Sequence, residues 1–299
     1  MYNNFFHLTS DPFGINPNPK FLYMMPHTRE ALAGLVYGIS SRKGFIVLTG
    51  EVGTGKTTLL NRALLEFDQR RLFTSFVFNP RLDITDFLEF VLIDFGITPV
   101  SRSKSSMLIQ LNRWLVERYA RKEVCVVIVD EAQNLSLDLL EEIRLLTNLE
   151  TSTEKLLQIV LSGQPEFEEK LRDPSVRQLR QRISIWCRTH VLSAEETAAY
   201  IAQRLRIAGA SERIFSDEAA AAVYNLSRGI PRTINLICEH ALIHCYAEQL
   251  RIVPAEVVFA AAQDLGLQVR EFRSQSGGGY PIAADDRNGS RNPSSRIPG

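Results

Sequence analysis

Gly50-Glu-Val-Gly-Thr-Gly-Lys-Thr57 matches the phosphate-binding loop pattern GxxxxGK[ST] at every fixed position. The apolar run 44–49 before it predicts a buried strand, and residues 58–65 after it predict a helix. Glycines let such a loop turn its amides toward an anion at the positive end of the helix. The stretch therefore predicts a nucleotide-binding protein. The alternative is a glycine-rich turn that arose by chance.

Within this loop, Lys56 is expected to reach the terminal phosphates and Thr57 to hold magnesium. The residues expected to contact the nucleotide are Gly50, Glu51, Val52, Gly53, Thr54, Gly55, Lys56, Thr57 and Thr58.

The composition is that of an ordinary globular protein. A length of 299 residues with 45% hydrophobic content accommodates one large or two modest domains. The 34 basic and 34 acidic residues give zero net charge, so no overall field recruits nucleic acid or an anionic membrane. The 4 cysteines form no CxxC pair, which favours buried thiols in a reducing compartment over a zinc site. They are Cys125, Cys187, Cys238 and Cys245.

The sequence predicts a cytoplasmic protein. No run approaches the roughly 18 apolar residues that a membrane span requires, and the N-terminus lacks a basic region followed by an apolar core. Any association with a membrane is therefore expected to come through a partner.

Strands and helices alternate up to about residue 190, which predicts a parallel sheet covered on both faces. The predicted strands are 44–49, 72–78, 124–129, 156–161 and 183–191. Helices are predicted at 27–41, 58–65, 84–95, 104–121, 137–150 and 165–171.

Beyond Ser193 the pattern contains helices only, at 194–208, 216–228, 233–249 and 254–265. Ser193 and Glu196 form a capping-box pattern at the first of them. We therefore expect an α/β domain over residues 1–192, including an aromatic N-terminal segment, and an all-helical domain over 193–268. The Gly, Ser, Pro, Asn and Arg rich residues 269–299 are expected to be a disordered tail of unassigned role.

Asp130-Glu131 directly follows the nearly pure β-branched run 124–129. Four apolar residues followed by two acids fit a magnesium-ordering Asp130 and a Glu131 that polarises the water attacking the γ-phosphate. The alternative is an aspartate that caps an ordinary strand-to-helix turn.

The next strand runs into Ser162-Gly-Gln164. If this strand neighbours the one before Asp130, Gln164 lies beside the γ-phosphate position and senses it, with Ser162 as the second candidate. The alternative is an amide that only caps the following helix.

Two arginine-bearing segments complete the candidate site. Arg182, in the run Arg177-Gln-Leu-Arg-Gln-Arg182, is preferred over Arg177 and Arg180 as an arginine that reaches a neighbouring subunit's nucleotide. In Gly229-Ile-Pro-Arg232, glycine can end one helix and proline can start the next, which projects Arg232 toward the nucleotide. The alternatives are a solvated helix face and an ordinary helix-helix turn.

Together, GEVGTGKTT, VVIVDEAQ, LSGQ, RQLRQR and GIPR resemble an AAA+ ATPase. More narrowly, the opening FF-L-S-PF with FLY, LLTNLET, LQIVLSGQPE and LRQRI are similar to the ExeA/GspA-type secretion ATPases. Relatives of that family include ATPases encoded with exopolysaccharide and exosortase systems and pilus-biogenesis proteins. The resemblance covers residues 1–268.

The resemblance implies a P-loop NTPase base domain with a parallel sheet, a C-terminal helical lid, Mg-ATP bound between them, and a homo-oligomer with arginine fingers in trans. It keeps the roles given above for the phosphate loop and the acidic pair. It adds Gln164 as sensor 1, Arg182 as the finger and Arg232 as sensor 2. The aromatic segment around Phe13 and His27 would lie near the adenine, although packing alone could also explain it.

The implied function is ATP hydrolysis that drives or regulates assembly of an envelope secretion or exopolysaccharide export system. The partner would be a membrane-bound assembly protein, with the chain peripheral to the inner membrane through it. No segment after residue 268 predicts a membrane span or a peptidoglycan-binding domain, so direct action on the cell wall is not expected. The alternatives are a DNA-binding regulator resembling transposition helper ATPases, which is not favoured, and a nucleotide-dependent scaffold with little turnover.

Overall fold

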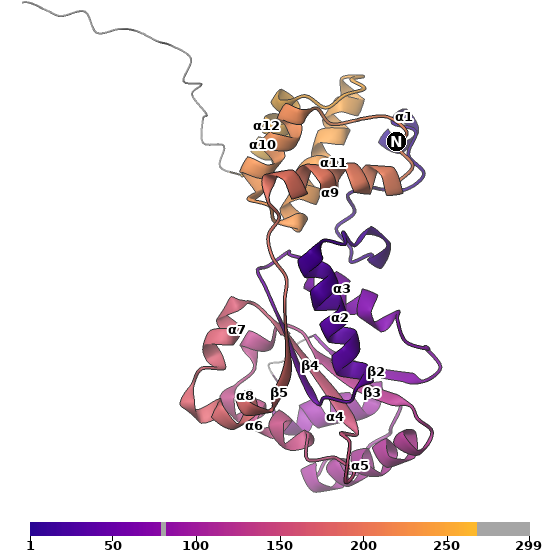
Figure 1. Ribbon diagram of the computed structural model, residues 1–299, viewed down its shortest axis with the longest axis vertical. Coiled ribbons are helices and arrows are strands. Elements are labelled where there is room, and N and C mark those ends of the chain that lie inside the picture. The colour runs from indigo at the N-terminus through magenta and orange to yellow at the C-terminus, as the bar shows by residue number, and fades with distance from the viewer. Residues whose placement is uncertain (79–81, 268–299) are drawn as a thin grey trace, which may run out of the picture. The chain divides into compact units, whose positions relative to one another are not determined.

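The computed structural model describes residues 1–78 and 82–267 (Figure 1). The tail expected at 269–299 lies outside the described residues.

Five parallel strands form one sheet in the order β2-β3-β4-β1-β5. They are β1 (Phe45–Thr49), β2 (Leu72–Val77), β3 (Val124–Val129), β4 (Leu157–Gly163) and β5 (Ile183–Arg188). The parallel sheet predicted from the alternating pattern is therefore confirmed. β1 and β4 are buried at every residue, as expected for central strands with both faces covered.

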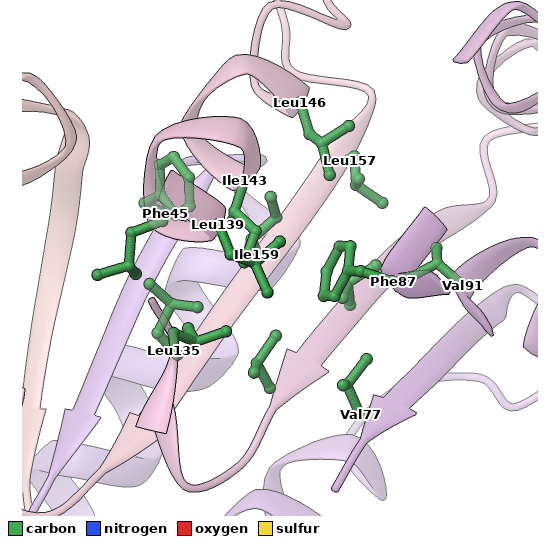
Figure 2. Packing of buried hydrophobic residues seen from close by; sticks show 14 of the residues in the cluster. Phe45, Val77, Phe87, Val91, Leu135, Leu139, Ile143, Leu146, Leu157 and Ile159 are labelled. Carbon is green, nitrogen blue, oxygen red and sulfur yellow. The ribbon is translucent and has the colours of Figure 1, made fainter. Parts of the chain in front are cut away.

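Alternate residues of β1 face opposite layers of helices. Phe45 and Val47 belong to the cluster with α4 (Ile84–Asp94), α5 (Lys104–Ala120) and α6 (Leu137–Leu146). Figure 2 shows Phe45 and Ile159 of the sheet beside Leu139 and Ile143 of α6. The other two inner residues, Ile46 and Leu48, pack with α2 (Pro26–Ser40) and α3 (Lys56–Leu64). Burial on both faces fixes the register, because a shift by one residue would exchange the two sets.

The register aligns the carboxyl ends of the strands. Thr49 of β1 lies beside Gly163 of β4, and Val129 of β3 lies beside Leu161 of β4. The phosphate loop, Asp130 and Gln164 therefore leave the sheet at the same edge, where parallel α/β sheets bind their ligands.

Helix α6 is shorter than the predicted helix 137–150 and ends at Leu146. The hydroxyl of Thr147 donates to the carbonyl oxygen of Arg144, and the following residues fold into a short turn closed by an antiparallel bridge between Glu150 and Lys155. Side-chain bonds at the helix end compete with further helical bonds, which the apolar spacing does not reveal.

The last four helices share one hydrophobic core. They are α9 (Ala194–Ile207), α10 (Asp217–Ser227), α11 (Pro231–Ala247) and α12 (Ala255–Asp264). The predicted capping box is present, because the Glu196 N–H donates to Ser193 Oγ at 3.1 Å and the Ser193 N–H donates to Glu196 Oε2 at 2.8 Å. We call this helical part the lid and the α/β part the base.

The aromatic N-terminal segment packs into the lid core, whereas residues 1–192 were expected to form one base domain. Tyr2 of α1 (Tyr2–Phe5), Phe13 and Phe21 are buried in the same cluster as α9 to α12. Arg204 of α9 donates to the carbonyl oxygen of Pro12 at 2.5 Å, and its guanidinium lies 4.7 Å from the centre of the Phe21 ring. The segment precedes the base in sequence, so its composition alone did not show which core it joins.

All four cysteines are buried and free, as predicted. Burial raises the pKa of the Cys125 thiol to about 12, which keeps it protonated and unreactive at neutral pH. Among the described helices, none combines the length and the apolarity needed to cross a membrane.

Candidate functional site

The phosphate loop connects β1 to α3 as predicted. Gly55 caps α3 in the left-handed conformation, with φ of 95°, which glycine adopts without strain. The Nζ of Lys56 donates to the carbonyl oxygens of Gly50 at 2.8 Å and Glu51 at 3.1 Å. Burial lowers the pKa of Lys56, while the nearby Asp130 and Glu131 carboxylates raise it. The ammonium group is thus held inside the loop, at the start of a helix whose free N–H groups favour an anion.

Gly50 is required by a close approach from the segment after β5. A Cβ on Gly50 would lie 2.0 Å from Oγ1 of Thr189 and 2.8 Å from its carbonyl oxygen. Oγ1 of Thr189 also lies 2.6 Å from Oγ1 of Thr54 in the loop. The chain leading to the lid therefore braces the phosphate loop, a contact that no sequence motif indicated.

Asp130, which follows β3, links the first turn of α3 and the end of β4 at the carboxyl edge of the sheet. Thr57 Oγ1 donates to its Oδ2 at 3.3 Å, and Ser162 Oγ donates to its Oδ1 at 2.8 Å. β4 does neighbour β3, which was the condition placed on the sensor prediction. The hydroxyl and carboxylate oxygens of Thr57 and Asp130 are the donor types that Mg²⁺ prefers, so these residues fit a magnesium site.

Glu131 is held in an unusual backbone conformation. Its φ of 54° and ψ of 39° place a non-glycine residue in the left-handed region, which costs about 1–2 kcal/mol. Its N–H donates to Asp130 Oδ1 at 3.0 Å. Gln164 Nε2 donates to Glu131 Oε2 at 3.0 Å. The predicted sensor side chain thus contacts the predicted catalytic carboxylate.

A cavity of about 240 Å³ lies at this edge of the sheet. It is lined by Lys56, Thr57, Asp130 and Glu131 of the base. Its other walls come from the N-terminal segment and the lid, with Ile15, Asn18, Tyr23 and His27 from the first and Tyr200, Arg204, Arg232 and Asn235 from the second. Phe13 and His27 were the two N-terminal residues expected near the adenine. His27 lines the cavity, whereas Phe13 is fully buried in the lid core.

Arg232 lies in the first turn of α11, on the cavity wall. Pro231 begins this helix, as predicted from Gly229-Ile-Pro-Arg232. Gly229 has a φ of 73°, and a Cβ on it would lie 1.9 Å from the carbonyl oxygen of Leu192. The Leu192 N–H donates to the Gly229 carbonyl oxygen at 2.8 Å, which ties the turn to the chain entering the lid.

The three candidate finger arginines differ in their surroundings. Arg177 and Arg180 of α8 (Arg177–Arg182) are exposed. Arg182 is half-buried, and its Nη1 donates to Thr147 Oγ1 at 2.7 Å and Asn148 Oδ1 at 2.8 Å, at the end of α6. Arg182 therefore caps a helix in its own chain. A role in trans remains a prediction for all three.

Arg188, at the end of β5, was not anticipated and also lines the cavity. Its guanidinium donates to both carboxylate oxygens of Glu168, at 2.9 and 2.8 Å, and Thr49 Oγ1 donates to the same carboxylate at 2.5 Å. The hydrogen bond from Arg188 holds the pKa of Glu168 below its usual range. The pairing of β1 with β5 places Arg188 beside Thr49, and the helix after β4 brings Glu168 to them, so sequence spacing could not reveal this contact.

Comparison with known proteins agrees with this geometry. The family model described as an AAA domain matches residues 39–171. The chain is 43% identical to general secretion pathway protein A of Aeromonas hydrophila over 270 residues, which is 90% of this chain and 49% of that protein. The chain thus spans about half the length of that relative.

Solved structures show the same fold at low sequence identity. Cdc6p of Pyrobaculum aerophilum has a TM-score of 0.68 and 19% identity, covering 86% of this chain and 71% of that one. The Drosophila ORC bound to DNA has a TM-score of 0.63 and 18% identity, covering 86% of this chain and 65% of that one. At these identities the likeness shows the fold alone.

Proposed function

Because this chain has the AAA+ fold and is related to general secretion pathway protein A over nine-tenths of its length, we propose that it is an ATPase that works in envelope secretion. The observation that carries the ATPase proposal is a single cavity lined by Lys56, Thr57, Asp130, Glu131 and Arg232. A cation in a phosphate loop, an oxygen set for a metal and a carboxylate at one edge suit phosphoryl transfer to water.

Each residue has a defined task. Lys56 exchanges the loop carbonyls that its Nζ now contacts for oxygens of the β- and γ-phosphates. Thr57 and Asp130 would hold magnesium, which would supply positive charge to neutralise the transferring phosphoryl group. Glu131 orients the attacking water and accepts its proton, in a position fixed by its left-handed backbone. Gln164 responds to the γ-phosphate through the carboxylate that it contacts.

The lid and neighbouring copies complete the site. Arg232 binds the γ-phosphate from the lid and so couples nucleotide state to lid position. The chain works as a homo-oligomer, in which α8 supplies an arginine to the next subunit's nucleotide. The exposure of Arg177 and Arg180 supports either of these for that task, because the guanidinium of Arg182 is occupied at the end of α6.

The cellular task follows the relative's name. The chain drives or regulates assembly of a secretion or exopolysaccharide export system, and it is held at the inner membrane by a membrane-bound protein partner. Sedimentation with inner-membrane vesicles from its own cell tests this. Binding is expected to be lost when the vesicles are first stripped with protease, and binding that survives stripping would point to lipid instead.

The initial rate of phosphate release from Mg-ATP tests the enzymatic proposal. Glu131→Gln is expected to lower the rate by roughly 100-fold or more while leaving ATP binding intact. Lys56→Ala is expected to abolish binding. Glu117→Gln, the same change at an exposed position of α5, serves as the control. Equal rates for wild type and Glu131→Gln would remove Glu131 from the mechanism.

A further inference from the structure

Gln133 lies two residues after Glu131, in the 3-10 turn η2 (Ala132–Asn134). Its side chain turns back, and Nε2 donates a hydrogen bond to Oε2 of Glu131. Gln133 does not line the nucleotide cavity, whereas Glu131 does. The amide therefore supports the carboxylate from behind.

Both ends of the Gln133 amide are engaged, which fixes its orientation. Its Oε1 accepts the main-chain N–H of Gln164 at 3.1 Å, so Nε2 must be the atom that faces Glu131. A flipped amide would place its oxygen against the carboxylate and its NH₂ against another N–H. The contact with Glu131 is thus a donor contact.

Two amides meet at one carboxylate oxygen of Glu131. Gln164 Nε2 donates to the same Oε2 at 3.0 Å. Two donors on Oε2 hold the plane of the carboxylate and leave Oε1 to accept a proton from water. A carboxylate with only one of these donors could rotate between two equivalent orientations.

Gly163, the last residue of β4, leaves room for this arrangement. A Cβ on Gly163 would lie 3.1 Å from Oε1 of Gln133 and 2.9 Å from Cβ of Phe167. The second contact involves a Cβ atom fixed to the backbone, so a side chain on Gly163 would push toward the Gln133 amide. The absence of a side chain at Gly163 therefore helps to keep the Gln133 amide in its place beside Glu131.

Lys170, at the end of α7 (Pro165–Lys170), fastens the backbone that carries Gln133. Its Nζ donates to the carbonyl oxygen of Gln133 and, at 2.7 Å, to that of Leu135. Burial lowers the pKa of Lys170. The turn is thus held at two carbonyls, and the Gln133 side chain reaches Glu131 from a fixed base.

We propose that Gln133 is a positioning residue for ATP hydrolysis. Its amide, together with that of Gln164, holds the Glu131 carboxylate in the orientation in which Oε1 receives the proton of the attacking water. The proposal rests on the proposed ATPase function and adds to it a residue that acts only through Glu131.

Gln133→Met keeps the length of the side chain and fills its space but has no donor. We expect kcat for phosphate release to fall roughly 10- to 100-fold, because small misplacements of a reacting group cost that much. The KM for ATP and the Kd for ATP are expected to change less than twofold, since Gln133 lies outside the cavity. Gln133→Ala tests the same loss in case the methionine distorts the turn.

Gln110→Met is the matched control. The Gln110 amide also bridges two loop groups, accepting from the Val100 N–H at 3.1 Å and donating to the Thr98 carbonyl oxygen at 3.2 Å, but it does so on α5. Its kcat should equal that of wild type. If Gln133 had only a structural role, Gln133→Met and Gln110→Met would both lower the stability of the protein. Neither variant would then lower kcat while leaving the KM for ATP unchanged.

A double variant isolates the route of action. In the Glu131→Gln background, Gln133→Met should cause no further loss of kcat, because the group it positions is already gone. Wild-type kcat in Gln133→Met, or an additive loss in the double variant, would overturn the inference. A wild-type protein that releases no phosphate would instead overturn the proposed function, and this inference with it.

Discussion

The main-chain N–H of Arg232 donates a hydrogen bond to the carbonyl oxygen of Gly53 at 3.1 Å. The first turn of lid helix α11 is thereby bonded to the middle of the phosphate loop. A Cβ on Gly53 would lie 2.7 Å from Cβ of Arg232, so the two backbones approach as closely as glycine allows. We therefore expect a shift of the loop on binding a phosphate to be transmitted to the lid.

Because this bond is made by the backbone, Arg232→Ala keeps it and removes only the side chain, for which we propose a contact with the phosphates. The free energy of unfolding without ATP should change by less than about 0.5 kcal/mol. ATP binding should weaken roughly 10- to 100-fold, which corresponds to one lost hydrogen bond to a charged group. Isothermal titration calorimetry measures the Kd for ATP, and Arg206→Ala, at an exposed position of α9, is the control. Unchanged affinity would place the guanidinium away from the phosphates.

Gly229→Ala should disrupt the junction from the other side. The added Cβ meets the Leu192 carbonyl oxygen at 1.9 Å, and the residue must also keep a φ of 73°. Gly96 has a φ of 78°, and no atom of the described residues lies within 4 Å of a Cβ built on it, so Gly96→Ala carries the backbone strain without the clash. Urea unfolding should show a loss of about 1 kcal/mol for Gly96→Ala and a clearly larger one for Gly229→Ala. Equal losses of stability in the two variants would mean that the chain around Leu192 moves aside for the added Cβ at no cost.

Local patterns were sufficient for the sheet and for the centre of the site. The phosphate loop and Asp130-Glu131 each lie between a buried apolar run and a turn, so their placement at one sheet edge followed from strand polarity alone. Ser193 and Glu196 were predictable for the same reason, since a capping box lies within four residues.

Other contacts required the tertiary structure. The close contact of Thr189 with Gly50, which leaves no room for a Cβ on Gly50, depends on how the strands pair. The hydrogen bond from Gln133 to Glu131 depends on how one turn folds back. The family resemblance implied that Phe13 lies near the adenine, in the domain expected over residues 1–192, yet it packs with Phe215 of the lid. Hydrophobic content shows that a side chain is buried but not which of two cores receives it.

Arg182→Ala should destabilise the fold, because its Nη1 satisfies oxygen acceptors at the end of α6. A charged donor in such a contact contributes about 1.5–3 kcal/mol, so the free energy of unfolding should fall within that range. Arg180→Ala, exposed on the same helix, should change it by less than about 0.5 kcal/mol. Urea unfolding of both variants checks this. If Arg182→Ala leaves the free energy of unfolding unchanged, the contacts of Arg182 within its own chain are weak, and Arg182 stays a candidate for a role in trans.

Mixing variants identifies the trans arginine. Lys56→Ala chains lack a working nucleotide site but keep the arginines of α8. Arg180→Ala or Arg177→Ala chains keep the nucleotide site but lack one of these arginines. If the arginine acts on a neighbour, a mixture should release phosphate faster than the sum of its separate parts. A strictly additive rate for every α8 variant would exclude complementation in trans.

The partly buried carboxyl group of Glu239, which contacts Tyr2 of the N-terminal segment, is expected to make the stability of the fold depend on pH. The Tyr2 hydroxyl lies 2.8 Å from both carboxylate oxygens of Glu239. Burial raises the pKa of Glu239 above its ordinary value of 4.5, and this outweighs the lowering effect of the hydrogen bond from Tyr2. Burial and the neighbouring Glu239 also raise the pKa of Tyr2, so Tyr2 stays a hydroxyl donor.

The sign of the effect follows from this shift. A carboxyl group whose pKa is higher in the folded state binds its proton more tightly there, so its contribution to stability is complete below pH 4.5 and is lost as the pH rises through the folded-state value. Glu239→Gln keeps an acceptor for Tyr2 and removes the titration. The free energy of unfolding of this variant minus that of wild type should therefore be more positive at pH 7 than at pH 4.5. Urea unfolding at the two pH values measures it. Glu212→Gln, exposed in the loop between α9 and α10, should show no such difference, and a flat or reversed dependence for Glu239→Gln would show that burial does not govern this carboxyl group.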